Sequence, residues 1–374
     1  MSATAAVLRS AGAPFTLEPL DLPAPGAHEI LVRIVGAGLC HTDLVVRHLP
    51  PEWAPLPAVL GHEGAGVVEA VGTAVTRVAV GDHVVLTYDS CGWCEKCHTG
   101  QPSFCAEFSD RNELGLRPGT NGAGRDAGGV ELQTRWFGQS SFATHSLATE
   151  RNVVKVDPDL PLELLGPLGC GIQTGAGAVL NALEVRFDSS LVVFGTGAVG
   201  LAAVMAARVA GARTIIAVDL HPNRLDLAQD LGATHCIAGN DPDIAAQIVA
   251  LTGGGATHAL DTTAVPSVIA AALGSLRTRG KLGLVGGGGA PLDLPQEALM
   301  AGQQISFIIE GNSVPHVLIP QLIELWKEGR FPFERLVSYY PLARINEAER
   351  DFKSGAAIKP ILLPGDAAAG PQAD

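Results

Sequence analysis

The sequence is short of positive charge and of cysteine, and both shortages exclude classes of protein. Lysine and arginine number 25 against 38 aspartates and glutamates, so the formal net charge is −13. An acidic chain is poorly suited to electrostatic binding of nucleic acid or of an anionic membrane. The seven cysteines are an odd number and too few for a disulfide scaffold in 374 residues. We therefore expect neither a nucleic-acid partner nor a disulfide framework.

A secretory leader and a convincing membrane span are also missing. Residues 1–10 lack the basic region and the apolar run of a secretory signal. The seventeen uncharged residues 191–207 are marginal for a span, contain three glycines near their start and end at Arg208. A buried strand that leads into a buried helix explains them better. These absences predict a cytoplasmic protein with no membrane partner.

The pattern of apolar residues changes along the chain and predicts two kinds of domain. Hydrophobic residues make up 47% of the sequence, enough for sizeable cores in two or three domains. Short strand-like runs at 29–35, 64–71 and 82–86 predict an antiparallel, barrel-like β domain. After about residue 170, strands such as 191–194 and 214–218 alternate with helices, which indicates a parallel, doubly wound sheet. The predicted fold class is α/β, with a β-barrel domain beside a doubly wound parallel-sheet domain.

Four cysteines stand close together as Cys91-x-x-Cys94-x-x-Cys97-x7-Cys105. Four thiolates at this spacing can surround one ion tetrahedrally, and sulfur ligands select zinc over magnesium or calcium. Because no coordination position stays open, we expect a structural zinc that holds its lobe together. Four unrelated cysteines and an iron–sulfur cluster are the alternatives. A nucleic-acid-binding zinc ribbon is disfavoured by the net charge and by the lack of a basic cluster near these cysteines.

A second set of candidate ligands is dispersed along the chain. Cys40, His62 and Cys170 together supply two thiolates and one imidazole, the three-ligand set of a catalytic zinc with an open fourth position. Each alone is a weak signal, because a lone buried cysteine usually acts as a small hydrophobe. The cysteine count supports the grouping, since four belong to the first cluster and two to this one. The remaining Cys236 is read as a core residue.

A glycine motif follows the predicted strand 191–194 and opens a helix. Gly195 permits a tight turn, Gly197 lets the backbone approach a pyrophosphate, and Gly200 allows close packing of helix and strand. Asp219 ends the next strand, where its carboxylate can accept hydrogen bonds from the adenosine ribose and repel a 2′-phosphate. The motif therefore predicts a dinucleotide site that favours NAD over NADP. Arg224 could partly offset that repulsion, which leaves some NADP use open.

Together these motifs resemble the zinc-dependent alcohol dehydrogenases of the medium-chain dehydrogenase/reductase superfamily, over essentially the whole chain. The two-cysteine, one-histidine ligand set is the one known for the catalytic zinc of alcohol dehydrogenase. The stretches FGQSSFATH at 137–145 and ERNVVKV at 150–156 are most similar to the aryl-alcohol or benzyl-alcohol dehydrogenase branch. The motifs that carry the resemblance are CHTD at 40–43, GHEGAGVVEAVG at 61–72, CGWCEKC at 91–97, GC at 169–170 and GTGAVG at 195–200.

The resemblance implies a domain division, cofactors and an assembly. Residues 1–171 and 311–374 would form a GroES-like catalytic domain, with the structural-zinc lobe at about 88–108. Residues 172–310 would form an inserted Rossmann domain that binds NAD. The family also implies two zinc ions per subunit, one catalytic and one structural, and a homodimer or homotetramer.

The resemblance further assigns roles around the catalytic zinc on Cys40, His62 and Cys170. Glu63 would be an outer-sphere carboxylate able to approach the metal, and Asp43 would hold the zinc-bound imidazole by a hydrogen bond. Thr42 would accept the proton of the substrate alcohol.

Three more positions are read from the family pattern. His41 and Lys359 would lie near the cofactor pyrophosphate. Val45 stands where a histidine often finishes the proton relay, so the exit of the proton stays open, with His48 as the candidate substitute.

The predicted reaction is the reversible oxidation of a primary alcohol to an aldehyde, with hydride transfer to NAD. Val45, Trp136, Phe137 and Ile308 are predicted to line an apolar, aromatic pocket, which favours aromatic or allylic alcohols. A thiol-dependent formaldehyde dehydrogenase of the same superfamily is the alternative activity, and a protein that binds zinc and dinucleotide without catalysis is the alternative class. A quinone reductase is disfavoured, because relatives of that type usually lack both zinc sets.

Overall fold

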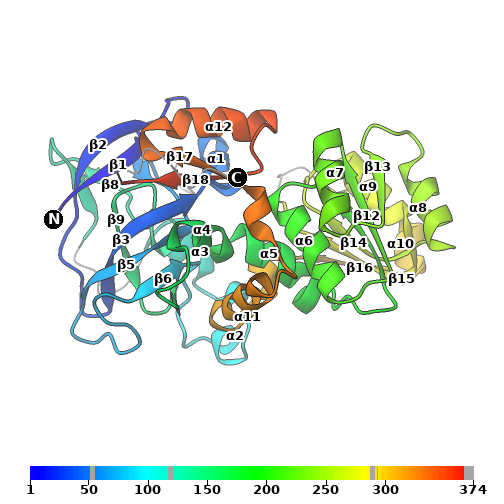
Figure 1. Cartoon of the computed structure of the whole chain (residues 1–374), viewed down its shortest axis with the longest axis horizontal. Helices are drawn as coiled ribbons and strands as arrows, with labels where there is room; N and C mark the ends of the chain where they lie inside the picture. The colour runs from blue at the N-terminus through cyan, green and yellow to red at the C-terminus, as the bar shows by residue number, and fades with distance from the viewer. Residues whose placement is uncertain (51–54, 117–121, 287–290, 293, 366–374) are drawn as a thin grey trace. The chain divides into compact units, whose positions relative to one another are not determined.

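A computed structural model of the chain describes residues 1–50, 55–116, 122–286, 291–292 and 294–365, which fall into two compact units (Figure 1). The first unit comprises Met1–Cys170, Val314–Pro320 and Glu334–Asp374. The second comprises Gly171–Ser313 and Gln321–Phe333. The sequence prediction had placed the inserted domain at 172–310.

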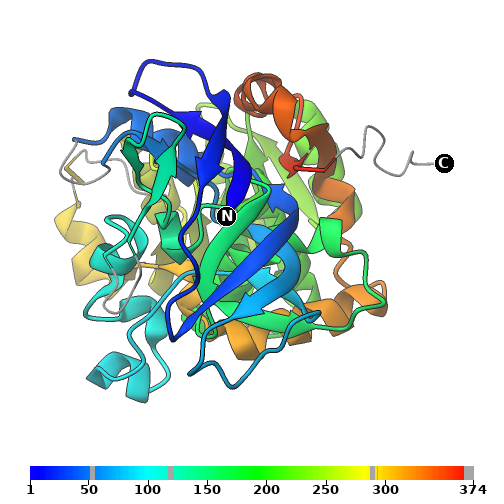
Figure 2. The ribbon, with the colours of Figure 1, turned by 90° about the vertical axis from the view of Figure 1, so that its left-hand side faces the viewer.

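Two sheets build the first unit, whose amino-terminal strands are blue in Figure 2. The smaller has the order β4-β1-β2-β7-β8, from β1 (Ser2–Leu8), β2 (Thr16–Asp21), β4 (Ala58–Val59), β7 (Gly124–Asp126) and β8 (Glu131–Leu132). The larger has the order β10-β6-β5-β3-β18-β17, with β9 also paired to β3. Its strands are β3 (Glu29–Gly38), β5 (Gly64–Val71), β6 (His83–Leu86), β9 (His145–Thr149), β10 (Val153–Val156), β17 (Val337–Pro341) and β18 (Lys359–Leu363).

The pairing within the larger sheet brings distant parts of the chain to one place. β3 pairs antiparallel with β5, β9 and β18, so the carboxyl end of the chain returns to a strand near its start. Short helices fill the connections: α1 (His41–Val45), η1 (Val46–His48), α2 (Glu95–His98), η2 (Pro102–Phe104), α3 (Phe108–Asn112), η3 (Trp136–Gly138), α4 (Leu162–Leu165), η4 (Gly166–Gly169), η8 (Leu342–Arg344) and α12 (Ile345–Ser354). These connections carry most of the predicted site residues, as is usual for loops on a rigid scaffold.

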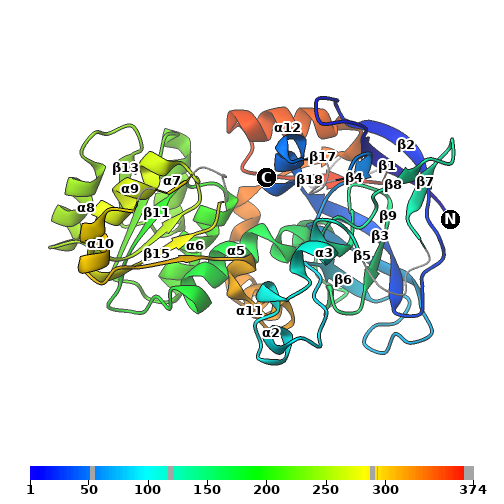
Figure 3. The same ribbon diagram turned by 180° about the vertical axis from the view of Figure 1, so that it is seen from behind.

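The second unit contains a six-stranded parallel sheet with the order β13-β12-β11-β14-β15-β16 (Figure 3). Its strands are β11 (Ser190–Phe194), β12 (Thr214–Asp219), β13 (His235–Ala238), β14 (Ala256–Asp261), β15 (Leu276–Leu284) and β16 (Gln304–Phe307). β11 lies between two neighbours and is buried from its second residue on, as expected for a central parallel strand. The predicted α/β class, with a β-barrel domain and a doubly wound parallel sheet, is confirmed.

Helices connect successive strands of this sheet and pack on it. α6 and α7 pack together along β12, and α8 and α9 pack together along β14. The helical elements are α5 (Gly171–Gly177), η5 (Ala178–Ala182), α6 (Ala198–Val209), α7 (Pro222–Leu231), α8 (Ile244–Thr252), α9 (Pro266–Gly274), α10 (Gln296–Met300) and η6 (Glu310–Asn312), with α11 (Pro315–Lys327) and η7 (Phe333–Leu336) shared by the two units.

The uncharged residues 191–207 form the strand β11 and most of the helix α6, as the sequence predicted. Nine of the twelve residues of α6 are buried, which explains the absence of charge. Among the described residues, no helix is both long enough and apolar enough to cross a membrane.

The prediction that Cys236 is a core residue is wrong. Cys236 is exposed and lies in β13, an edge strand in which Ile237 is the buried residue. Side chains alternate between the two faces of a strand, so Cys236 and Ile237 point to opposite sides. The thiol donates a hydrogen bond to the backbone oxygen of Leu225 at 3.3 Å.

Candidate active site

Two thiols, an imidazole and a carboxylate meet inside the first unit. Cys40 follows β3 and caps α1, His62 and Glu63 directly precede β5, and Cys170 follows η4. The side chains of His62 and Glu63 are completely buried. The ligand atoms of all four lie within 4.8 Å of one another: Cys40, His62, Glu63 and Cys170. The fold thus gathers residues from three distant segments into one group of metal-binding donors.

Glycines allow these segments to come so close. A Cβ atom on Gly38 would lie 2.0 Å from Oε2 of Glu63. A Cβ atom on Gly169 would lie 1.9 Å from the backbone oxygen of Leu86. Any side chain at either glycine would push apart the turns that carry Cys40 and Cys170, because the atoms would overlap.

Asp43 joins two of the ligand-bearing segments. Its Oδ1 accepts hydrogen bonds from Nδ1 of His62 at 2.7 Å and from the amide of Gly61 at 3.0 Å, and its Oδ2 accepts one from the amide of Cys40 at 3.2 Å. A proton on Nδ1 leaves Nε2 of His62 with its lone pair free for a metal. That Nε2 is buried and has no nitrogen or oxygen partner among the described residues, only the thiol of Cys40 beside it. An unpartnered nitrogen beside two thiols fits zinc.

Glu63 is held by a buried lysine. Nζ of Lys359, the first residue of β18, lies 2.9 Å from both carboxylate oxygens of Glu63 and 3.3 Å from the backbone oxygen of Leu39. Burial raises the pKa of Glu63, although the charge of Lys359 acts in the opposite direction. The sequence had assigned Lys359 to the cofactor pyrophosphate; in the structure its ammonium lies against Glu63, and the pyrophosphate role stays a prediction.

The four-cysteine cluster forms a compact sulfur site. The sulfur atoms of Cys91, Cys94, Cys97 and Cys105 lie within 4.8 Å of one another. Sγ of Cys91 accepts hydrogen bonds from two backbone amides, at 3.3 and 3.4 Å, and Sγ of Cys105 accepts two, at 3.2 and 3.4 Å. Backbone hydrogen bonds from Ala106 and Cys97 lower the pKa of Cys94 to about 6, which favours the thiolate that binds metal. Four sulfurs with amide donors fit a closed zinc site.

The glycine motif has the shape that a dinucleotide site needs. Gly195 has a φ of +87°, which few other residues adopt. A Cβ atom on Gly200 would lie 1.9 Å from the backbone oxygen of Gly195, so only glycine lets α6 begin there. A Cβ atom on Gly197 would meet nothing within 4 Å, so the amino end of α6 is open where an anion would bind.

Asp219 ends β12 and turns toward this motif. Its carboxylate accepts hydrogen bonds from the amide and hydroxyl of Thr196, at 2.6 and 2.9 Å, and from the amide and Nδ1 of His221, both at 2.9 Å. Burial by itself would raise the pKa of Asp219, but these hydrogen bonds outweigh it and lower the pKa. The carboxylate is therefore an anion beside the glycine turn. Arg224, in α7, is half-buried.

Comparison with known proteins gives the family. A family model for the alcohol dehydrogenase GroES-like domain matches residues 26–158, and one for zinc-binding dehydrogenase matches residues 198–326. Geraniol dehydrogenase from Castellaniella defragrans is 46% identical over 370 residues, covering 97% of this chain and 98% of that protein. The chain belongs to the zinc-dependent alcohol dehydrogenases of the medium-chain dehydrogenase/reductase superfamily.

Solved structures of the alcohol dehydrogenase family agree. An alcohol dehydrogenase zinc-binding domain protein from Burkholderia ambifaria has a TM-score of 0.94 and 53% identity, covering 98% of this chain and 100% of that one. Benzyl alcohol dehydrogenase from Acinetobacter calcoaceticus has a TM-score of 0.93 and 45% identity, with the same coverage.

Thr42, the predicted proton acceptor of this alcohol dehydrogenase, lies beside the metal-binding donor Cys40. The hydroxyl oxygen of Thr42 is 3.8 Å from Sγ of Cys40. His41, assigned to the pyrophosphate, is exposed at the start of α1. Val45, at the end of α1, is half-buried, and His48 in η1 is exposed.

The predicted pocket residues lie in different surroundings. Trp136 is 2% exposed, and its Nε1 donates a hydrogen bond to Oδ1 of Asp43 at 3.0 Å. The ring of Phe137 packs on the imidazole of His62, with ring centroids 4.6 Å apart. Ile308 lies in the second unit and is 1% exposed.

Sequence reasoning missed three side chains that support these sites. Thr196 and His221 hold Asp219, as described above. Gln139 accepts a hydrogen bond from the amide of Gly64 at 3.0 Å and donates one to the backbone oxygen of His62 at 2.9 Å. The position of Thr196 inside the glycine motif was the one available signal; the other two depend on contacts that no local pattern shows.

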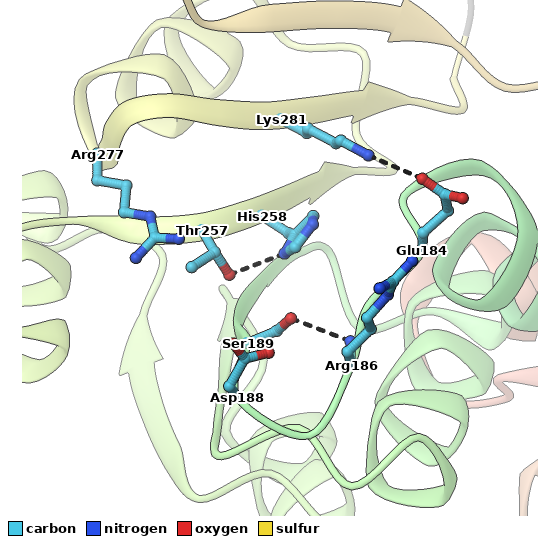
Figure 4. Close-up of a pocket in the computed structure, with 8 residues that line it drawn as sticks. All are labelled: Glu184, Arg186, Asp188, Ser189, Thr257, His258, Arg277 and Lys281. Atoms are coloured by element: carbon cyan, nitrogen blue, oxygen red, sulfur yellow. Dashed lines mark hydrogen bonds and ion pairs between the residues drawn. The ribbon is translucent and has the colours of Figure 1, made fainter.

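The second unit also holds a charged cavity of about 220 Å³, shown in Figure 4. Its walls include Arg186, Arg277 and Lys281, together with His258 and Glu184. Lys281 forms an ion pair with Glu184 at 3.2 Å (Figure 4). No residue that the sequence predicted for catalysis, cofactor or metal lines this cavity.

Proposed function

We propose that this alcohol dehydrogenase oxidises primary aromatic and allylic alcohols to aldehydes reversibly, and transfers the hydride to NAD. Two relatives support the substrate class, since one is named for geraniol and the other for benzyl alcohol. The ring of Phe137, packed on the imidazole of His62, places an aromatic side chain next to the metal donors. Aromatic side chains suit substrates with planar, apolar groups.

One observation carries the catalytic assignment. The Nε2 atom of His62 is buried and has no nitrogen or oxygen partner among the described residues, only the thiol of Cys40 beside it, while Nδ1 is held by Asp43. Burying an unpaired polar nitrogen is costly unless a ligand satisfies it. Two thiols and Glu63 lie within 4.8 Å, so the missing partner is a cation that prefers sulfur and imidazole.

The residues around this centre have separate tasks. When bound at Cys40, His62 and Cys170, zinc supplies the Lewis acidity that lowers the pKa of the substrate hydroxyl. Thr42 would relay the proton of that hydroxyl: its oxygen accepts the substrate proton while its own proton passes on to water, and the relay runs backwards in the reverse reaction. A hydrogen bond with Cys170 is the largest cause that lowers the pKa of Cys40 well below its usual value. Cys40 is therefore ready as a thiolate ligand.

The second unit supplies the site for the dinucleotide. The open amino end of α6 at Gly197 would receive the pyrophosphate, and the anionic Asp219 disfavours a 2′-phosphate. NAD provides the hydride acceptor when it is bound there.

The test is to follow reduction of NAD and of NADP in parallel with benzyl alcohol, geraniol and ethanol, with and without a zinc chelator. We expect chelator-sensitive reduction of NAD that is faster with benzyl alcohol and geraniol than with ethanol. Equal or better turnover of ethanol would refute the substrate class. Activity that requires formaldehyde and a low-molecular-weight thiol would replace the proposal with the thiol-dependent alternative.

A variant tests the proton acceptor. Thr42→Val keeps the shape and removes the hydroxyl, so kcat should fall about a hundredfold, the usual contribution of a positioned proton acceptor. Thr278→Val, on an exposed position of the second unit, is the matched control and should keep parental kcat. Parental kcat in Thr42→Val would remove Thr42 from the mechanism.

We further propose a cytoplasmic homodimer or homotetramer. The second unit exposes large apolar side chains at the edge strand β16 and at α10, with Phe307 47%, Leu299 60% and Met300 80% exposed. Exposed apolar groups beside an unpaired strand edge favour pairing with another copy. Light scattering after gel filtration tests the assembly, and a monomer would refute it.

A further inference from the structure

We propose that Trp136 is a positioning residue for the zinc ligand His62, acting through Asp43, and is not a wall of the substrate pocket. An indole nitrogen can only donate a hydrogen bond, so a buried tryptophan needs an acceptor. The acceptor of Trp136 is the buried Oδ1 of Asp43, at 3.0 Å. Because the side chain of Trp136 is 2% exposed and its N–H is bonded to Asp43, it offers little surface to a substrate.

The hydrogen bonds at Asp43 explain how the indole affects the metal ligands without contacting the metal site directly. Oδ1 accepts from three donors: Nε1 of Trp136, Nδ1 of His62 and the amide of Gly61. The amide of Cys40 donates to the other oxygen, Oδ2. The carboxylate therefore cannot rotate without disturbing the segments that carry Cys40 and His62. The hydrogen bond from the indole restricts its rotation further. Partners behind a metal ligand set the orientation of that ligand.

Trp136 is itself held firmly. The hydroxyl of Ser140 accepts a hydrogen bond from the amide of Trp136 at 2.8 Å and donates one to the backbone oxygen of Val59 at 2.6 Å. Phe137 adopts a φ of +51°, unusual for an aromatic residue, and this turn places its ring on His62. Gln139, two residues further, donates to the backbone oxygen of His62. The segment 136–139 thus contacts His62 in three ways: Phe137 packs on the imidazole ring, Gln139 binds the backbone oxygen of His62, and Trp136 binds Asp43, the partner of Nδ1.

The test is Trp136→Phe in the full-length, zinc-loaded protein, with the release of zinc to a chromophoric chelator as the readout. Phenylalanine keeps an aromatic ring and deletes only the N–H donor and the second ring. We expect the catalytic zinc to be released about tenfold faster, the scale of one lost hydrogen bond to a charged group. Zinc bound by Cys91, Cys94, Cys97 and Cys105 should be released at the parental rate. The catalytic zinc is identified with a Cys170→Ser variant, in which the phase of zinc release that belongs to this ion should be missing.

The matched control is Trp326→Phe, the same chemical change in α11 of the second unit, where the indole packs on Phe333. It should leave both release rates at the parental values. A rate for the catalytic zinc in Trp136→Phe that equals the control overturns the proposal. An equal acceleration of both zinc ions also overturns it, because that result shows a general loss of stability.

A second measurement needs no variant at Trp136. In the unmodified protein, removal of the catalytic zinc should shift one solvent-protected indole N–H resonance among the four tryptophans, and unshifted indole resonances overturn the proposal. A third test uses an Asp43→Ala background, which removes the acceptor oxygens: there Trp136→Phe should change zinc release much less than in the parent, because coupled residues are not additive. An undiminished effect there overturns the route through Asp43.

The inference rests on the zinc site of the proposed function, but the two can fail separately. A protein that binds no zinc at Cys40, His62 and Cys170 refutes the proposed function. A protein that binds this zinc and releases it at the parental rate in Trp136→Phe refutes the inference alone.

Discussion

Replacing Lys359 with methionine should destabilise the first unit by about 3–5 kcal/mol, because it leaves a buried carboxylate without its cation. Nζ of Lys359 lies 2.9 Å from both oxygens of Glu63, and the two side chains are 2% and 0% exposed. Nζ also donates to the backbone oxygen of Leu39 at 3.3 Å. The substitution removes three hydrogen bonds, two of them to a charged acceptor, from a place that solvent does not reach.

Two further variants separate the ion pair from other effects of the substitution. Lys155→Met removes a cation that is 57% exposed and lies 2.7 Å from Oδ1 of Asp82, so it should cost less than about 1 kcal/mol. The double variant Glu63→Gln, Lys359→Met leaves no unpaired charge and should recover most of the loss. The order of stabilities is therefore parent, Lys155→Met, double variant, Lys359→Met.

Urea unfolding of the zinc-loaded proteins, followed by tryptophan fluorescence with the zinc content measured in each sample, checks this order. A Lys359→Met protein within about 1 kcal/mol of the parent would refute the argument from the buried pair. If such a stable variant instead bound NADH more weakly, the pyrophosphate role predicted from the sequence would be the correct one.

Three other outcomes follow from the second unit. Gly200→Ala places a Cβ atom 1.9 Å from the backbone oxygen of Gly195, so NADH affinity measured by fluorescence titration should fall at least about tenfold; parental affinity would contradict the close approach. Burial and two neighbouring cations lower the pKa of His258 from 6.5 to about 4, so its neutral form contributes stability above pH 6.5 that is lost as the pH falls toward 4. Urea midpoints should therefore drop over this range by an amount equivalent to about 2 kcal/mol, and less so in His258→Gln. Asp219→Asn removes the charge that repels a 2′-phosphate, and the ratio of kcat/KM for NADP over NAD should rise about tenfold; an unchanged ratio would show that Asp219 does not set the preference.

The sequence predicts best where the residues of a site lie close together in the chain. Cys91, Cys94, Cys97 and Cys105 span one short loop, so their spacing restricts the geometry, and the structure brings all four sulfurs together. The glycine motif is equally local, because strand, turn and helix follow one another. The catalytic donors needed more than spacing: only the ligand count and the family resemblance linked Cys40 to Cys170 before the structure did.

Side-chain partners that are far apart in the chain could not be predicted from the sequence, for a physical reason. Lys359 and Glu63 are 296 residues apart, and they meet because β18 pairs with β3. Trp136 and Asp43 are 93 residues apart, and an aromatic residue near a predicted pocket is most simply read as its wall. Hydrogen-bonding capacity hints at such partners, since an indole buried by the fold must donate to something. The identity of the acceptor depends on the tertiary structure.

Asp219 shows how a correct local prediction still leaves the chemistry open. The motif placed a carboxylate where the adenosine ribose would lie, and a carboxylate has about four acceptor positions. In the structure Thr196 and His221 fill these positions with four donors. A ribose diol must therefore share or displace one of them. The imidazole of His221 is the donor that can leave, because its side chain is 44% exposed whereas Thr196 is completely buried. If Asp219 binds the ribose, as the sequence predicts, selectivity for NAD would depend on the exchange of the His221 imidazole for the ribose hydroxyls as well as on the charge of Asp219.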